Sequence, residues 1–132
     1  MDSIVLDASA ILAFLQQEPG GAKVLALLEG ANAQVAISAV NFSEVMTKLV
    51  RDGGSSTDIS VAMEPFRPLV VDFDLAQAER AAELYPATQS LGLSLGDRAC
   101  FALAESRDAR VWTADRAWKK LKVGVQVELV RS

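Results

Sequence analysis

The sequence predicts an α/β fold of three layers, in which a mainly parallel, twisted sheet is flanked by helices on both faces. Short apolar segments with strand character alternate with segments whose apolar residues recur at helical spacing. Strands joined through helices form right-handed βαβ crossovers, and such crossovers build parallel sheets that are covered on both sides. Because 132 residues is an ordinary size for one domain, we expect residues 1–132 to form a single domain.

Two strands and four helices are expected in the first half of the chain. Residues 3–6 and 34–38 are short and largely apolar, which is typical of buried parallel strands. Apolar residues at helical spacing predict helices over residues 10–15, 22–29, 42–50 and 57–64. A Pro-Gly-Gly sequence at residues 19–21 separates the first two helices, and a Gly- and Ser-rich turn at residues 52–56 separates the last two.

The second half of the chain continues the alternation. Pro65 and Pro68 end the fourth helix, and a strand is expected directly after them at residues 69–71. An amphipathic helix over residues 74–85 is expected to end at Pro86. The segments expected after it are a helix at 97–106, a strand at 110–113, a short helix at 115–120 and a partly alternating edge strand at 123–129.

The chain contains no histidine and a single cysteine, Cys100, which limits the chemistry open to it. Without histidine, neither Ser-His-Asp nor Cys-His nucleophilic catalysis is available, and RNA cannot be cleaved by a histidine pair. Cys100 lies in an apolar helical run, which indicates a buried core position rather than a reactive thiol. Any hydrolytic activity must therefore rest on carboxylates, with a metal ion that generates hydroxide at neutral pH.

The composition also bears on the location and the partners of the protein. No apolar run reaches the roughly 18–20 residues needed to span a membrane, and the N-terminus lacks the basic region of a signal peptide. A single cysteine cannot form an internal disulfide. We therefore expect a cytoplasmic protein with no membrane association. Hydrophobic residues make up 51% of the chain, which indicates that part of the surface is buried against a partner or a second copy.

The net charge of −4 argues mildly against simple tracking of a nucleic-acid backbone, because such binders are usually basic. If four of the 17 acidic residues are metal ligands, however, the remaining 13 balance the 13 basic residues. Basic residues gather in one stretch of the chain, namely Arg98, Arg107, Arg110, Arg116, Lys119, Lys120 and Lys122. Both a solvated helix face and a contact with a phosphate backbone fit this stretch.

Four acidic residues fall where the carboxyl ends of the strands are expected, namely Asp7, Glu44, Asp97 and Asp115. Asp7 follows the first strand directly, and Asp115 lies two residues after the strand at 110–113. Glu44 lies early in the helix after the second strand, and Asp97 opens a helix whose start should lie along the same rim. Ligands of parallel sheets bind outside the carboxyl ends of the strands. The pattern therefore predicts that four carboxylates converge on one site.

Each of these acids also has an ordinary structural explanation. Asp97 and Asp115 fit N-caps of helices, and Glu44 could lie on an exposed polar stripe of its helix. Asp7 is harder to explain in this way, because a carboxylate that ends a buried strand is costly unless something compensates it. Carboxylates packed together raise one another's pKa values, and a magnesium ion with oxygen ligands resolves their repulsion.

Four stretches in order resemble the motifs of the PIN-domain ribonucleases, and specifically of the VapC-type toxins of toxin–antitoxin pairs. The stretches are IVLDASA at residues 4–10, NFSEV at 41–45, LSLGDRAC at 93–100 and VWTADRAW at 111–118. Each stretch carries one of the four acids. The resemblance extends from residue 3 to about residue 129 and therefore covers nearly the whole chain.

The resemblance implies a PIN-like domain that depends on magnesium, with manganese able to substitute, and that cleaves RNA endonucleolytically. It also implies a homodimer and a cognate antitoxin that covers the active site. Asp7, Asp97 and Asp115 would hold one or two metal ions, with Glu44 as a further ligand or as the group that orients the attacking water. In-line attack by this water would leave a 5′-phosphate.

Four further residues beside the acids have possible roles in this site. Ser9 and Thr113 are expected to hydrogen-bond the metal ligands, although helix capping by Ser9 and strand propensity of Thr113 explain them equally well. Arg98 and Arg116 each follow a predicted ligand directly and could contact the RNA backbone. External salt bridges are the alternative for both arginines.

Three other functions fit parts of this pattern. A receiver-like phosphoacceptor module would carry a second acid beside Asp7 and a lysine near the end of its last strand, yet no lysine follows Lys122. A haloacid-dehalogenase-like phosphatase would need an acid where Ser9 stands. A catalytically silent PIN domain that acts only as a binding module stays open, although the intact acids argue against it.

Overall fold

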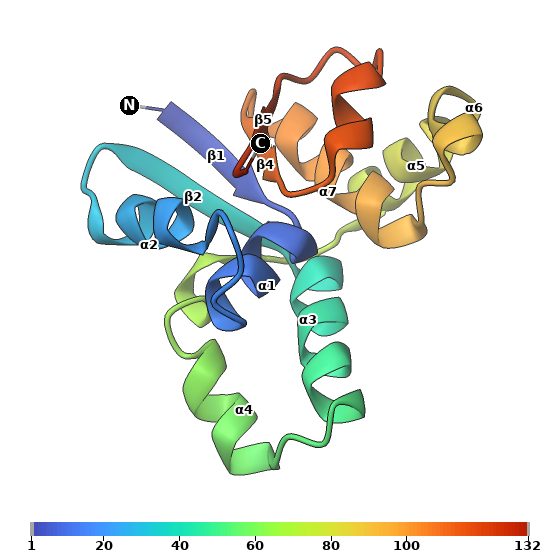
Figure 1. Ribbon diagram of the computed structural model, residues 1–132. Helices are drawn as coiled ribbons and strands as arrows, with labels where there is room; N and C mark the ends of the chain where they lie inside the picture. Colours follow the sequence, from blue (N-terminus) through green and yellow to red (C-terminus); the bar gives the residue numbers. More distant parts are fainter. Residues whose placement is uncertain (1, 132) are drawn as a thin grey trace.

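A computed structural model describes residues 2–131, which form a five-stranded, all-parallel sheet with helices on both faces (Figure 1). The strands are β1 (Asp2–Leu6), β2 (Ala33–Ser38), β3 (Val70–Val71), β4 (Arg110–Thr113) and β5 (Val127–Leu129). Their order is β3-β2-β1-β4-β5, so β1 is the central strand. The predicted three-layer α/β/α fold is confirmed, and even the edge strand β5 runs parallel to its neighbour β4.

Helices connect these strands throughout the described part of the chain. The α-helices are α1 (Ala8–Leu15), α2 (Gly21–Glu29), α3 (Ala39–Arg51), α4 (Ser56–Met63), α5 (Leu75–Glu83), α6 (Tyr85–Thr88) and α7 (Leu95–Ser106). The short 3-10 helices are η1 (Arg67–Leu69), η2 (Gln89–Leu91) and η3 (Arg116–Lys120). None of the helices within residues 2–131 has both the length and the apolar character needed to cross a membrane.

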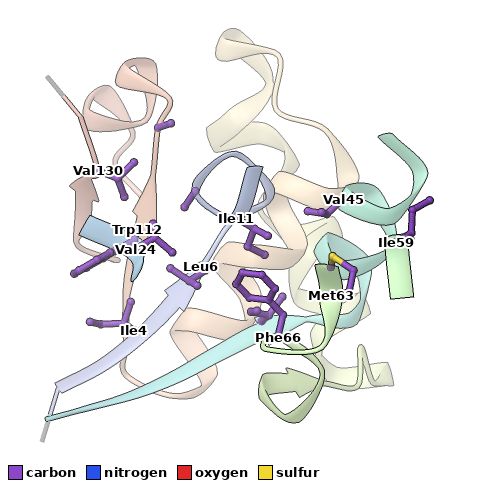
Figure 2. Close-up of a cluster of buried hydrophobic side chains, with 13 residues drawn as sticks. Ile4, Leu6, Ile11, Val24, Val45, Ile59, Met63, Phe66, Trp112 and Val130 are labelled. Carbon is purple, nitrogen blue, oxygen red and sulfur yellow. The ribbon is translucent and has the colours of Figure 1, made fainter. Parts of the chain in front are cut away.

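Alternate side chains of the central strand enter two separate cores. Ile4 and Leu6 point into the core that α1, α2, α3 and α4 build on one face of the sheet (Figure 2). Val5 points into the core that α7 and η3 build on the other face, and α5 packs against the outside of α7. Successive residues of a strand face opposite sides of a sheet, so one apolar strand serves both layers. Cys100 is buried in the second core, as predicted.

Three strands lead directly into helices at the same edge of the sheet. Asp7 follows β1 and caps α1, while Ser38 ends β2 and caps α3. Asp115 follows β4 and caps η3. Because the strands are parallel, these helix starts lie side by side along their carboxyl ends. The start of α7 joins this edge through α3, which packs beside α7 (Figure 1).

The expected end of the helix at Pro86 is wrong. The helix α5 already ends at Glu83, and Pro86 lies in the first turn of the separate short helix α6. Proline is tolerated there because the first residues of a helix need no N–H donor. The strand expected at residues 69–71 is also shorter than predicted, because residue 69 belongs to η1.

Two further boundaries differ from the sequence-based expectation. The helix α7 begins at Leu95 rather than at Asp97, because Ser94 is its N-cap and accepts a hydrogen bond from the Asp97 backbone at 3.2 Å. The final strand covers only three of the residues 123–129. Gly124 has a φ of 74°, a left-handed conformation that a regular strand does not contain.

Candidate active site

Asp7 lies at the carboxyl end of the central strand and is only 3% exposed. Its Oδ1 accepts hydrogen bonds from the Ala10 backbone N–H and from Ser9 Oγ, both at 2.8 Å. Its Oδ2 accepts a hydrogen bond from Thr113 Oγ1 at 2.6 Å. Each of these donors favours the ionised carboxylate, so the surroundings are built to accept a negative charge at this point.

Burial nevertheless makes the negative charge on Asp7 costly. Desolvation outweighs the hydrogen bonds from Thr113, Ala10 and Ser9, which lower the pKa of Asp7, so that this pKa is raised from 3.8 to about 6. Repulsion from Asp97 adds to the increase. A buried carboxyl with a raised pKa among other acids is a common property of functional sites, because a bound cation can supply the missing compensation.

Ser9 and Thr113 connect Asp7 to the end of the neighbouring strand β4. The Ser9 Oγ accepts a hydrogen bond from the Ala114 N–H at 2.9 Å and lies 3.2 Å from Thr113 Oγ1. The Thr113 Oγ1 in turn accepts a hydrogen bond from the Asp115 N–H at 3.0 Å. The structure therefore brings both hydroxyls that the sequence singled out against the carboxylate of Asp7, and Thr113 is fully buried there.

Asp97 is half-buried in the first turn of α7 and forms a capping box with Ser94. Its Oδ2 accepts a hydrogen bond from the Ser94 N–H at 3.0 Å. Desolvation raises the pKa of Asp97, the two hydrogen bonds with Ser94 lower it, and repulsion from Asp115 raises it again. The alternative that Asp97 is an N-cap is wrong in detail, because Ser94 holds that position and Asp97 lies three residues later.

Glu44 projects from α3 toward the start of α7. Its Oε1 accepts a hydrogen bond of 2.8 Å from Asn41 Nδ2, and the side chain is half-buried rather than solvated as the polar-stripe alternative required. Desolvation raises the pKa of Glu44, the hydrogen bond from Asn41 lowers it, and repulsion from Asp97 raises it. Asn41 is 1% exposed, and no sequence pattern assigned it a role in the site.

Asp115 is the most exposed of the four acids. Its Oδ1 accepts a hydrogen bond from the Ala117 N–H at 2.9 Å, which is the capping role that the sequence left open. It also lies near enough to Asp97 to raise the pKa of that carboxyl. Capping and participation in an acidic site are therefore compatible for Asp115.

The four carboxylates interact electrostatically, and Asp97 takes part in each of these interactions. Asp97 raises the pKa of both Asp7 and Glu44, and its own pKa is raised by Asp115. Cys100 lies beneath them, and burial together with three of these acids raises the pKa of its thiol well above the usual value. The structure thus brings together the four residues that lie far apart in the sequence.

The chemistry of this donor set suits a hard divalent cation, because carboxylate oxygens are the ligands that magnesium and manganese prefer. Within residues 2–131, however, no three acidic or cysteine side chains are grouped so that they could hold an ion as they stand. The Asp97 carboxylate accepts a hydrogen bond from the N–H of the N-cap Ser94, and the Asp115 carboxylate accepts one from the Ala117 N–H of η3. The residues fit the ion by charge and ligand type, and a rotation of these side chains would free their oxygens.

The two arginines beside the acids have different surroundings. Arg98 donates a hydrogen bond from Nη1 to the Ala81 carbonyl at 2.9 Å, and its guanidinium lies 5.4 Å from the centre of the Tyr85 ring. It is therefore engaged with α5 and α6 instead of pointing freely from the surface. Arg116 is exposed at the start of η3, directly after Asp115. A contact of either arginine with RNA stays a prediction.

The family model of the PIN domain matches residues 4–124 of the chain. Curated protein sequences gave no significant match.

Several solved structures are similar in fold over nearly the whole chain. One is VapBC2 from Rickettsia felis bound to a DNA fragment from its promoter, with 16% identity, coverage of 96% of this chain and 98% of that chain, and a TM-score of 0.74. Another is DNA-bound VapBC from Salmonella typhimurium, with 17% identity, coverage of 98% and 99%, and a TM-score of 0.73. A third is VapC20 from Mycobacterium tuberculosis, described as a sarcin–ricin loop cleaving toxin, with 17% identity, coverage of 89% and 93%, and a TM-score of 0.71.

Proposed function

The chain belongs to the PIN domain family, and on this premise we propose that it is a metal-dependent endoribonuclease that acts as the toxin of a toxin–antitoxin pair. The observation that carries the proposal is the group of four acids around Asp97, three of which have raised pKa values. Because the chain has no histidine, these carboxylates are the groups available for hydrolysis. RNA is the substrate class we expect, since the similar VapC20 is described as cleaving the sarcin–ricin loop.

In this proposal, Asp7, Asp97 and Asp115 hold one or two magnesium ions, and Glu44 is either a further ligand or the group that orients the attacking water. The bound ion would lower the pKa of that water and stabilise charge on the scissile phosphate. Ser9 and Thr113 hold the Asp7 carboxylate in one orientation through hydrogen bonds of 2.8 and 2.6 Å. Asp7 therefore enters the reaction already fixed in place.

Binding of RNA would depend on the basic residues next to the acids. Arg116 and Lys119 belong to η3, the short helix that begins directly after the proposed ligand Asp115. Lys120 extends the same short helix. Contacts from such side chains to phosphates would position the RNA without specifying its sequence.

A protein partner is also part of the proposal. The similar structures from Rickettsia felis and Salmonella typhimurium are VapBC assemblies, and one from Klebsiella pneumoniae is described as a toxin–antitoxin complex. We expect this chain to bind a cognate antitoxin that inhibits the site, and to form a homodimer in the cytoplasm. Exposed apolar side chains such as Val61 and Leu75 offer surface for such contacts.

Membership of the PIN family leaves the receiver-like and dehalogenase-like functions without support. A catalytically silent PIN domain is the competing function that an experiment must address. Such a domain would bind RNA but leave it intact at every metal concentration.

The test uses purified protein and end-labelled RNA, with Asp7→Asn and Asp97→Asn as variants. We expect cleavage with Mg²⁺ or Mn²⁺, none in EDTA, and a loss of at least about 100-fold in each variant. Asp74→Asn is the matched control, because Asp74 is an exposed N-cap of α5 outside the site and asparagine caps equally well. Cleavage that persists in EDTA or in both site variants contradicts the proposed mechanism.

A further inference from the structure

Gly96 is buried in the first turn of α7, directly before Asp97, and the Glu44 carboxylate lies against it. A Cβ atom at this position would overlap with the carboxyl carbon and both carboxylate oxygens of Glu44. Gly96 is not among the residues with positive φ, so its backbone conformation is open to any residue. The space that a side chain at this position would need is filled by the end of the Glu44 side chain, so a larger residue fits only if that carboxylate moves.

Asn41 connects the same two elements by hydrogen bonds. Its Nδ2 donates to Glu44 Oε1 at 2.8 Å and to the Gly96 carbonyl at 3.0 Å. Both partners are acceptors, so exchanging the amide oxygen and nitrogen of Asn41 would place three oxygens together. The two acceptors therefore determine which way this buried amide points.

We propose that Gly96 and Asn41 are positioning residues that together hold the Glu44 carboxylate against α7, beside Asp97. Gly96 provides the space into which the carboxylate fits, and Asn41 provides the donor that keeps it there. The inference rests on the proposed function, because it gives Glu44 a fixed place in the acidic site. A glutamate side chain has several rotatable bonds, so restricting it in advance avoids an entropic cost when the site is used.

Substitution of Gly96 by alanine distinguishes a role in positioning Glu44 from a role in the stability of the fold. Alanine is favoured over glycine within helices, so Gly96→Ala should not weaken α7 itself. The added methyl group can fit only if the Glu44 carboxylate moves away from Asn41. We therefore expect a folded protein with a displaced Glu44. Gly30→Ala is the control outside the site, because residue 30 is exposed with a φ of −80°. Its added Cβ would lie 3.3 Å from the Ala26 carbonyl oxygen, a tight contact that a shift of a few tenths of an ångström relieves.

The kinetic test is a double-mutant cycle with Glu44→Ala. We expect Gly96→Ala to lower kcat for RNA cleavage by about 10–100-fold, with an unchanged KM for RNA and a cooperative thermal transition that shows a folded protein. In the Glu44→Ala background, the same substitution should have no further effect, because the group that it displaces is gone. The inference is overturned if Gly96→Ala is fully active, or if its loss is equally large in both backgrounds.

Asn41→Ala provides a second cycle that does not depend on the fit of a methyl group. We expect it to lower kcat in the wild-type background and to have no further effect on kcat when Glu44 is already alanine. If the losses in kcat from Asn41→Ala and Glu44→Ala add up in the double variant, Asn41 does not act through Glu44, and the inference is contradicted.

The crystal structure of Gly96→Ala supplies a readout that is independent of activity. We expect the Glu44 carboxylate to have left its hydrogen bond with Asn41, and a carboxylate that remains in place overturns the inference. If the wild-type protein fails to cleave RNA, the proposed function fails, whereas this structure still decides whether Gly96 and Asn41 position Glu44. The two failures are therefore distinguishable.

Discussion

Replacing Asp7 with asparagine should stabilise the metal-free protein, although it removes a group that we place in the active site. Desolvation raises the pKa of Asp7 from 3.8 to about 6, which corresponds to about 3 kcal/mol in favour of the neutral carboxyl. Asparagine has nearly the same shape and is neutral. One acceptor position becomes a donor, so one hydrogen bond from Thr113 or Ala10 is lost at a cost of about 1 kcal/mol. The net gain expected at pH 7 is about 2 kcal/mol.

The pH dependence of this effect has a definite sign. Below pH 3.8 the carboxyl is protonated in both the folded and the unfolded protein, so Asp7 carries no electrostatic penalty. Between pH 3.8 and about 6 the unfolded chain has already ionised while the folded protein still binds the proton, so stability falls as pH rises. Above about pH 6 the penalty is complete and constant. The free energy of unfolding of Asp7→Asn should therefore not fall over this pH range. Its stability advantage over the wild type should appear only as the pH rises.

Urea unfolding in EDTA at several pH values between 4 and 7.5 measures the effect. A thermal melt is the second readout. For a chain of 132 residues, a gain of about 2 kcal/mol in the free energy of unfolding corresponds to an increase in melting temperature of about 7 °C. Asp74→Asn is the control, because Asp74 is an exposed N-cap outside the site and asparagine is also favoured there; it should lack the gain of about 2 kcal/mol at pH 7. An Asp7→Asn protein that is less stable than the wild type at pH 7, or equally stabilised at pH 4 and pH 7, refutes the reasoning.

Three further outcomes follow from the same site. Millimolar Mg²⁺ should raise the melting temperature of the wild-type protein but not of Asp7→Asn or Asp97→Asn, and equal increases in all three would exclude these ligands. Thr113→Val removes the 2.6 Å donor to Asp7 and should raise the pKa of that carboxyl further and weaken Mg²⁺ binding by about 10–100-fold in calorimetry, whereas Thr113→Ser should bind almost normally. The RNA fragments should carry 5′-phosphates, as judged by ligation without prior phosphorylation, and 2′,3′-cyclic phosphates would point to attack by the ribose instead.

The parts of the structure that depend on local sequence were predicted well. The apolar strand before Asp7, the alternation of strands and helices, and the order of the four motifs were sufficient for the fold and the family. The start of α7 was misplaced because Asp97 and Ser94 both have side chains that cap helices, and only the geometry shows which one is the N-cap. Pro86 was misread for a related reason, because a proline can begin a helix as well as end one.

The support around Glu44 could not be predicted, because it depends on packing between distant segments. Asn41 and Gly96 are 55 residues apart, and each is unremarkable within its own helix. Only the close approach of α3 and α7 shows that Asn41 supplies a hydrogen-bond donor and that Gly96 supplies space for the Glu44 carboxylate. The raised pKa of Asp7 has the same origin, since its burial comes from the elements packed around the end of β1.

The central claim is that the acids around Asp97 cut RNA, and mapping of RNA ends in cells tests it most directly. Total RNA is sequenced from its 5′-phosphate ends shortly after brief induction of the wild-type chain or of Asp97→Asn. We expect a small set of new ends at defined positions with the wild-type chain and none with Asp97→Asn. The same new ends with both proteins, or none with either, would contradict the claim.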